Sequence, residues 1–142
     1  IIVGRGKLHK DLLEYIERND LTIFVKIINF VENPFTLLKQ TELFILSSKY
    51  EGLPNVLLEA LTLRKFIISS NCPTGPKEIL LNGKGGLLFN VGNHNQLSKK
   101  ILYYVENKKK CLKMLRYAMQ NLYRFDYQKN LKKYLNLVNQ II

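Results

Sequence analysis

The stretch LFILSSKYEGLPNVLLEA, residues 43–60, joins a wholly apolar run to a helix-like segment through a loop that contains Gly52 and Pro54. The run at 43–46 has no polar alternation, which is typical of a strand buried on both faces of a sheet. Pro54 suits the first position of a helix, so the spacing predicts a helix over 54–63. The stretch therefore predicts a strand, a loop and a helix in succession, the repeating unit of parallel sheets.

Similar units lie on both sides of this stretch. Further strands are predicted at 1–4, 21–28, 66–68 and 86–89, and helices at 7–19, 34–40, 76–81, 95–106, 108–123 and 127–141. Strands that alternate with helices predict an α/β fold: a doubly wound, Rossmann-like parallel sheet, here with a helical C-terminal extension. Ligands bind such sheets beyond the carboxyl ends of the strands, so we expect the loops there to share one rim.

The composition is that of a globular domain, with 142 residues, 46% of them hydrophobic and 23% charged. It argues against disorder, and no apolar run approaches the roughly 20 residues that span a bilayer. Cys72 and Cys111 form neither a disulfide framework nor a zinc motif, so we expect buried or half-buried free thiols in a reducing compartment. The chain starts at Ile1 without a signal-peptide pattern, and we expect it to be part of a longer protein.

Most of the net charge of +11 lies in the last third of the chain. Residues 1–90 carry 11 basic and 9 acidic residues, whereas residues 91–142 carry 11 basic and 2 acidic ones. One buried face and an opposite, solvated basic face are predicted by the helical spacing of Leu112, Leu115, Met119 and Leu122. Such a face also fits an anionic membrane surface. We expect no nucleic-acid partner.

The loop before the helix at 54–63 has the features of an anion site. With Pro54 in the first helical position, Leu53 becomes the N-cap, and leucine has no side-chain oxygen to accept from the free amides of the first turn. The amides at 55–57 are then open to an outside acceptor such as a phosphate. Gly52 allows a ligand to approach the backbone closely.

Two carboxylates flank this anion site. Glu59 lies roughly 7–8 Å beyond the first turn at 1.5 Å per residue, about the separation of a diphosphate from its ribose. It could accept hydrogen bonds from two vicinal hydroxyls, and Glu51 could meet hydroxyls on the other side of the phosphates. Spacing alone leaves a plainer interpretation open, in which Glu51 is solvated and Glu59 is a surface helix residue.

The segment EGLPNVLLEAL, residues 51–61, resembles the signature of family 4 retaining glycosyltransferases, in which seven residues separate two acids. The likeness covers roughly residues 1–105. Its other matching blocks lie at 33–35, 43–48, 71–80 and 82–88. An ordered series of blocks is a far more specific signal than one pair of acids.

The resemblance implies the C-terminal, donor-binding half of a two-domain GT-B enzyme. This family transfers a sugar from a nucleotide donor, most often a UDP-hexose, with retained configuration and usually without a metal, so we expect no metal or other cofactor. Carried over by position, Glu51 is the catalytic residue that contacts the donor sugar, Glu59 holds the ribose, and Gly4 lines the crevice at the end of the first strand. The backbone that touches the sugar and diphosphate is that of Gly52, Leu53, Pro54, Asn55 and Val56.

The resemblance also implies a domain plan and a location. Residues 1–92 are the nucleotide-sugar-binding core, residues 93–142 are helices that complete the same domain, and the N-terminal acceptor domain lies outside this chain. The protein is expected in the cytoplasm, with peripheral contact at the inner face of the membrane, in lipopolysaccharide or capsule biosynthesis. The family's basic pair for the diphosphate precedes the segment that matches Ile1, and Arg5 and Lys7 are not assigned its role. We therefore expect the chain by itself to bind donor weakly and to transfer nothing.

Two positions depart from the family pattern, and two other functions stay open. Arg64 stands where the family usually has Gly, so we expect left-handed backbone or a tighter helix end there. Gly85 replaces a common Tyr, which is expected to loosen the turn at 82–86. A nucleotide-sugar epimerase of the same architecture would need further acid–base residues. A basic module could instead bind membrane or nucleic acid without catalysis.

Overall fold

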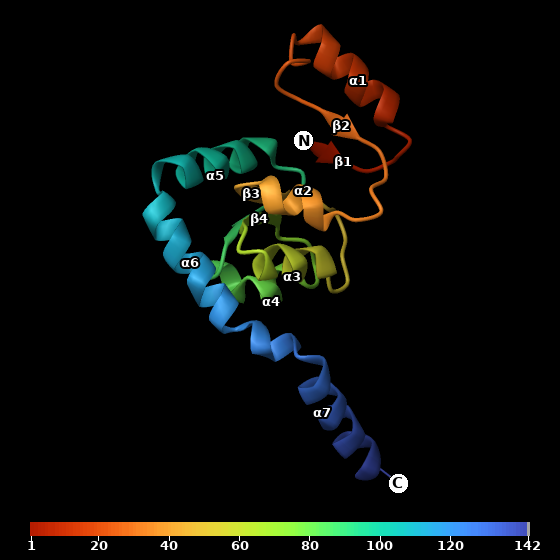
Figure 1. Ribbon diagram of the computed structural model, residues 1–142, viewed down its shortest axis with the longest axis vertical. Coiled ribbons are helices and arrows are strands. Elements are labelled where there is room, and N and C mark those ends of the chain that lie inside the picture. The colour runs from red at the N-terminus through yellow and green to blue at the C-terminus, as the bar shows by residue number, and fades with distance from the viewer. Residues whose placement is uncertain (142) are drawn as a thin grey trace. The chain divides into compact units, whose positions relative to one another are not determined.

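The computed structural model describes residues 1–141 and divides into two compact units, Ile1–Thr36 and Leu37–Ile142 (Figure 1). In the first unit β1 (Ile2–Val3) pairs in parallel with β2 (Ile27–Ile28). In the second unit β3 (Leu43–Leu46), β4 (Phe66–Ser70) and β5 (Leu87–Phe89) form a parallel sheet in that order. The predicted α/β class with parallel strands is confirmed, although the strands form two sheets instead of one continuous sheet.

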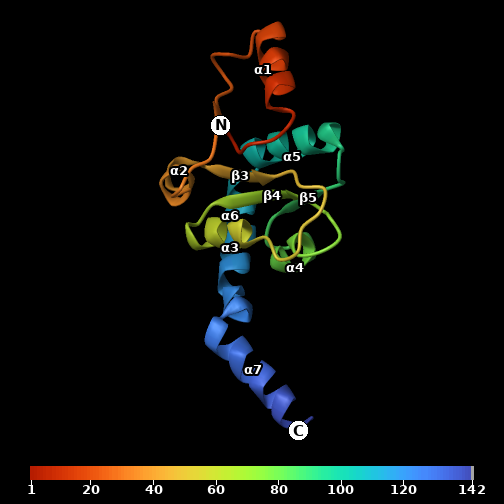
Figure 2. The same cartoon turned by 90° about the vertical axis from the view of Figure 1, so that its right-hand side faces the viewer.

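Helices cover both faces of the sheet in the second unit. Figure 2 shows α3 (Asn55–Thr62) and α4 (Pro76–Ile79) on one face and α5 (His94–Glu106) on the other. The helix α6 (Lys108–Gln120) contacts β4, α3 and α5. Leu46 of β3 pairs with Ser69 of β4, so the carboxyl ends of these two strands lie at the same edge of the sheet.

The core of the second unit is built on β4, whose five residues are all buried. Leu57 of α3 and Ile67 of β4 have no exposed surface, and Leu115 of α6 is 5% exposed. Each such side chain contributes about 2 kcal/mol through the removal of apolar surface from water. Cys72 and Cys111 are free thiols in this core, as expected, and burial raises the pKa of Cys111.

The first unit carries less buried surface. Its helix α1 (His9–Arg18) buries only Ile16. The prediction of a strand over 21–28 is wrong for most of its length, because residues 21–25 form a turn in which the Val25 amide donates to the Leu21 carbonyl at 2.8 Å. Asp20 turns the chain with a φ of 53°, and β1 offers only two residues for pairing. The helix α2 (Phe35–Gln40) spans the boundary between the units.

The last two helices of the C-terminal part end before the predicted residues, and the one predicted over 127–141 ends at Asn139. The helix predicted over 108–123 ends at Gln120, and a 3-10 turn follows at Leu122–Phe125. The last helix, α7 (Tyr127–Asn139), begins where the Asp126 carboxylate accepts from the Lys129 amide at 2.8 Å, and none of its residues is buried. Because α5 and α6 pack on the strands of the second unit, they belong to its compact core, whereas the domain plan of 1–92 and 93–142 stays a prediction.

Both departures from the family pattern have a structural solution. Arg64 has a φ of 58°, which confirms the expected left-handed backbone, and its amide donates to Leu61 while the next amide donates to Ala60. These two bonds are a Schellman motif. The expected loosening at 82–86 is not what the structure shows: the Gly85 amide donates to the Leu80 carbonyl at 2.9 Å, and Gly85 is buried. A short 3-10 turn, Leu81–Gly83, precedes it.

Candidate functional site

The loop at 47–54, here called the signature loop, leaves β3 and enters α3. The N-cap is Pro54, with φ −71° and ψ 94°, and no side chain caps the helix. The prediction that Leu53 is the N-cap is therefore wrong by one residue, and α3 covers 55–62 instead of 54–63. The proline ring fixes only φ, so Pro54 keeps an extended ψ, and its carbonyl accepts from the Leu57 amide at 2.9 Å.

Two amides at the start of α3 remain open. The sequence predicts a free amide at Leu57, but this amide donates to the Pro54 carbonyl. The prediction of three free donors is therefore wrong. In the part of the chain that the structure describes, the amides of Asn55 and Val56 have no acceptor. Both point along the axis of a helix whose dipole favours negative charge at this end. The backbone can therefore offer two donors to an anion.

An uncapped first turn is not by itself distinctive in this chain. The helices α1, α4 and α6 also lack a side-chain cap, whereas the Asn93 side chain caps α5 by accepting from the Gln96 amide at 2.8 Å. The helices α1 and α4 also follow parallel strands, so α3 shares with them its place at the edge where ligands bind such sheets. What distinguishes α3 is its sequence, which is the segment that resembles the signature.

Glu51 and Glu59, the two signature acids, are both half-buried. Glu51 lies in the signature loop and Glu59 in α3, where its backbone carbonyl accepts from Leu63 at 3.0 Å. Within residues 1–141, neither carboxylate forms a hydrogen bond or an ion pair. Both carboxylates therefore keep their acceptor atoms for hydroxyls from outside the chain, and their roles stay predictions.

The segment after β4 holds the signature loop, a feature that the sequence analysis missed. The Ser70 hydroxyl donates to the Ser48 carbonyl at 2.6 Å, and the Thr74 hydroxyl donates to the Glu51 carbonyl. The sequence predicts that the loops beyond the strands share one rim, but it contains no local signal for these pairings. The only hint was the Gly75–Pro76 step, which marks a turn of unusual backbone.

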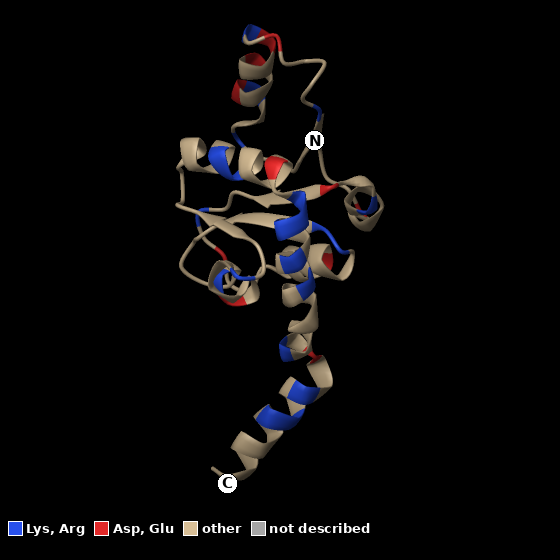
Figure 3. Ribbon diagram, turned by 90° about the vertical axis from the view of Figure 1, so that its left-hand side faces the viewer, with Lys and Arg blue, Asp and Glu red and all other residues tan. Residues whose placement is uncertain are grey.

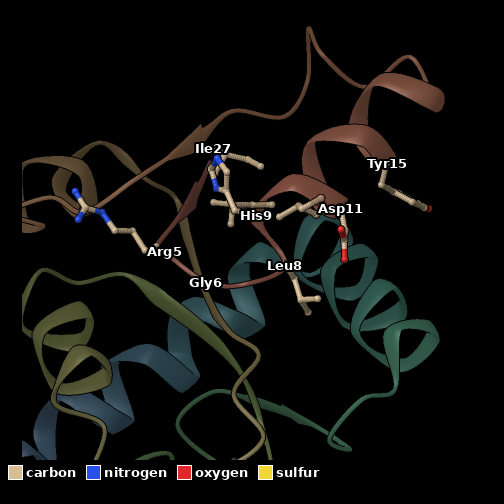
Figure 4. A pocket seen from close by; sticks show the side chains of 10 residues that line it. Arg5, Gly6, Leu8, His9, Asp11, Tyr15 and Ile27 are labelled. Atoms are coloured by element: carbon tan, nitrogen blue, oxygen red, sulfur yellow. The ribbon is translucent and has the colours of Figure 1, made fainter.

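Gly4 lies in the first unit, beside a cavity of about 470 Å³ (Figure 4). His9, Asp11 and Tyr15 of α1 also line this cavity, and the Arg5 side chain points away from these three residues. The signature segment belongs to the second unit. The place of Gly4 in a site with Glu51 therefore stays a prediction.

A second cavity, of about 290 Å³, lies at the opposite edge of the sheet in the second unit, where β3 and β4 begin. Lys108 donates to Glu42 at 2.8 Å, which lowers the pKa of Glu42 and raises the pKa of Lys108. Tyr104 stacks on Phe66 with ring centroids 5.1 Å apart, and burial raises the pKa of this tyrosine. No residue of the signature segment lines either cavity, and this cluster fastens α5 and α6 to the sheet.

Metal ligands are a separate question. Among the described residues, no group of three or more His, Cys, Asp or Glu side chains is arranged to hold a metal ion. The prediction that the function uses no metal or other cofactor stays a prediction.

Comparison with known sequences places these features in a family. The model of the family described as glycosyl transferases group 1 matches residues 1–121. The chain is 45% identical over 80 residues to an uncharacterized glycosyltransferase of Methanocaldococcus jannaschii, covering 56% of this chain and 20% of the relative. It is 33% identical over 106 residues to the N,N'-diacetylbacillosaminyl-diphospho-undecaprenol alpha-1,3-N-acetylgalactosaminyltransferase of Campylobacter jejuni, covering 75% of this chain and 28% of the relative.

Comparison with solved structures agrees. A crystal structure of a Staphylococcus aureus TarM mutant, in complex with fondaparinux, alpha-GlcNAc-glycerol and UDP, matches with a TM-score of 0.84 and 26% identity. The match covers 97% of this chain and 28% of that protein, so the chain spans less than a third of the length of each of these three proteins. The resemblance to GT-B glycosyltransferases is thereby confirmed. Because the family model covers most of its length, the chain belongs to the glycosyl transferases group 1 family.

Proposed function

We propose that this chain forms the donor site of a hexosyltransferase. It binds a nucleotide-sugar, a UDP-hexose, for retaining transfer to a surface-glycan or lipid-linked acceptor. The observation that carries the proposal is the pair of open amides at Asn55 and Val56, set between two carboxylates that have no partner within residues 1–141. The related TarM structure contains UDP, and the Campylobacter relative is named for a diphospho-undecaprenol acceptor.

The chemistry follows from where charge grows during transfer. The bond between the sugar and the diphosphate breaks, and negative charge builds up on the leaving nucleoside diphosphate. Amides already aimed at that charge stabilise it without having to reorganise. Glu59 accepts the ribose hydroxyls, and Glu51 contacts the donor sugar and is the residue we propose to be catalytic. The chain by itself binds donor weakly and transfers nothing.

Isothermal titration of the chain tests the donor assignment. UDP, UDP-glucose, UDP-N-acetylglucosamine and GDP-mannose are compared, each with and without EDTA, and we expect UDP-sugars to bind with unchanged affinity when EDTA is present. Glu59→Gln should weaken UDP binding about 10- to 100-fold, since a hydrogen bond to a charged group contributes about 1.5–3 kcal/mol. Glu106→Gln, at the exposed end of α5, is the matched control. Equal affinities for the two variants would contradict the ribose assignment.

A second proposal concerns the basic face of α6. Lys109, Lys113 and Arg116 follow one another at helical spacing on the side away from the buried residues Cys111 and Leu115, and Figure 3 shows basic residues along this helix. Residues 107–125 contain no acid. We propose that this face attracts the anionic inner surface of the membrane at which a lipid-linked acceptor lies. Within residues 1–141, no helix has the length and apolar character needed to cross a bilayer.

Vesicle sedimentation tests this second proposal. We expect the chain to sediment with phosphatidylglycerol vesicles and not with phosphatidylcholine vesicles, and to lose binding as salt rises. Reversal of the three α6 charges to Glu should abolish sedimentation. Reversal of Lys10, Lys26 and Lys49, which lie outside α6, is the control. Equal loss in both variants would show that only total charge matters, and tighter binding to an oligonucleotide would favour a nucleic-acid partner.

A further inference from the structure

The signature loop and the loop that follows β4, residues 71–75, lie at one edge of the sheet. The register of β3 against β4 brings them there, because Leu46 pairs with Ser69 and the two chains leave the sheet together. The β4 loop leads into α4 at Pro76. The two loops thus come from neighbouring strands.

Hydrogen bonds tie the signature loop to the β4 side. The Ser70 hydroxyl donates to the Ser48 carbonyl at 2.6 Å, near the start of the signature loop. The Thr74 hydroxyl donates to the Glu51 carbonyl, near its end. In both bonds a side-chain hydroxyl from the β4 side donates to a backbone carbonyl of the signature loop. No side chain of the signature loop takes part in either bond. The bond from Thr74 falls on the residue whose carboxylate we propose to face the donor sugar.

Close packing at Gly75 adds a second, independent constraint. Gly75 has φ 85° and ψ −66°, a conformation that L side chains rarely adopt. A Cβ at this position would lie 2.3 Å from Cδ of Pro54 and 2.4 Å from the carbonyl oxygen of Gly52. Pro54 is itself buried. The backbone at Gly75 is therefore the surface against which the last residues of the signature loop rest.

The adjoining turn is braced as well. The buried Cys72 thiol lies 3.9 Å from the Thr74 carbonyl, within reach of a weak hydrogen bond across the turn that presents the Thr74 hydroxyl. The contacts at Thr74 and Gly75 thus act on Glu51, Gly52 and Pro54, three of the last four residues of the signature loop. These are the residues that lead directly into the open amides of α3.

We propose that Thr74 and Gly75 are positioning residues for the donor site, which hold the signature loop from Glu51 to Pro54 in its binding shape without touching the donor. This inference rests on the proposed function. A loop that is already ordered loses less conformational freedom when ligand binds, and a small misplacement of a binding group weakens the productive contact steeply. Thr74 acts through its hydrogen bond to the Glu51 carbonyl. Gly75 acts because it has no Cβ, which would collide with Pro54 and with the Gly52 carbonyl.

Donor titration of paired threonine variants tests the proposal. Thr74→Val removes the hydroxyl and keeps the shape, and Thr74→Ser keeps the hydroxyl. The matched control is Thr62→Val, because the Thr62 hydroxyl also donates to a backbone carbonyl, that of Leu58 at 2.9 Å, but at the far end of α3. We expect Thr74→Val to bind the UDP-sugar about 5- to 10-fold more weakly, the effect of one lost hydrogen bond. We expect Thr74→Ser and Thr62→Val to bind it like the original chain.

The comparison of UDP-sugar with UDP alone separates positioning from general damage. If Thr74 acts through Glu51, its loss weakens the UDP-sugar more than UDP, and amide hydrogen exchange over 51–57 speeds up in Thr74→Val but not in Thr62→Val. Equal affinities and equal exchange for these two valine variants would overturn the positioning role while the donor assignment stands. If the original chain binds no nucleotide-sugar, the proposed function falls, and the positioning role falls with it.

Discussion

Gly85, in the turn before β5, leaves no room for a side chain beside Ala118 of α6, and the cost of adding one can be worked out. A Cβ added at Gly85 would lie 2.7 Å from the Cβ of Ala118, 3.3 Å from its Cα and 3.4 Å from the Leu80 carbonyl oxygen. Carbon atoms that touch normally stand about 3.5–4.0 Å apart, so α6 or the turn has to move by roughly 1 Å. Overpacking of this kind costs about 1–3 kcal/mol.

The smaller conformational freedom of alanine in the unfolded chain offsets part of this cost. Gly85 does not adopt a positive φ, so alanine fits its backbone and stabilises by about 0.4–1 kcal/mol through the unfolded chain. We therefore expect Gly85→Ala to lower the free energy of unfolding by about 1–2 kcal/mol. A double-mutant cycle with Ala118→Gly isolates the contact, since that change removes the atom 2.7 Å away. Ala118→Gly alone should cost about 1 kcal/mol as a glycine inside a helix.

Urea unfolding followed by circular dichroism measures the four proteins of the cycle. The double variant should be about as stable as Ala118→Gly alone, which makes the two changes non-additive by about 1–2 kcal/mol. Gly6→Ala is the control, because a Cβ at Gly6 would meet no atom within 4 Å. Additive losses in the double variant, or a Gly85→Ala protein as stable as the original, would refute the view that α6 rests directly on this glycine.

Three further changes test other parts of the second unit. Arg64→Gly should raise the free energy of unfolding by about 0.5–1 kcal/mol, because it relieves left-handed backbone at a non-glycine residue, and an unchanged urea midpoint would contradict this. Lys108→Met should raise the pKa of Glu42 back to its ordinary value, as measured by an NMR titration. Because the pKa of Glu42 is lower in the folded protein than in the unfolded chain, the ion pair stabilises the fold at neutral pH. That stability is lost as the pH falls through the folded pKa of Glu42. Leu57→Ala should cost about 2–5 kcal/mol in urea unfolding, because Leu57 has no exposed surface, and a loss below 1 kcal/mol would place it outside the core.

Strand prediction succeeded where polar residues bound an apolar run. The run of β3 was predicted to its exact ends, between Glu42 and Ser47, although Ile45 is 38% exposed and the strand is therefore not buried on both faces as the sequence predicts. The same reasoning failed over 21–26. An apolar, β-branched run is compatible with a strand, but its length is set by the available partner, and β1 supplies only two residues. Sequence alone does not contain the length of the partner strand.

The candidate site shows the same division between local and tertiary signals. The loop and helix that carry Glu51 and Glu59 follow from local signals: an apolar strand, a glycine, a proline and helical spacing. The cap moved by one residue because the ring of Pro54 leaves ψ free, and the Leu57 amide is not an open donor because it bonds to the Pro54 carbonyl three residues back. The contacts from Thr74 and Gly75 could not be predicted, because they join residues more than 20 positions apart.

Those contacts depend on the strand register, which connects the core to the site. Ser70 donates to Ser48 only because Leu46, two residues before Ser48, stands opposite Ser69, the residue before Ser70. A slip of one residue would shift β4 by about 3.3 Å and turn each of its side chains to the other face of the sheet. The fully buried Ile67 and Ile68 forbid that slip, since it would exchange the packing on both faces at once. The apolar residues of β4 therefore determine where the Thr74 hydroxyl meets the Glu51 carbonyl, although they lie inside the sheet and not in the loops.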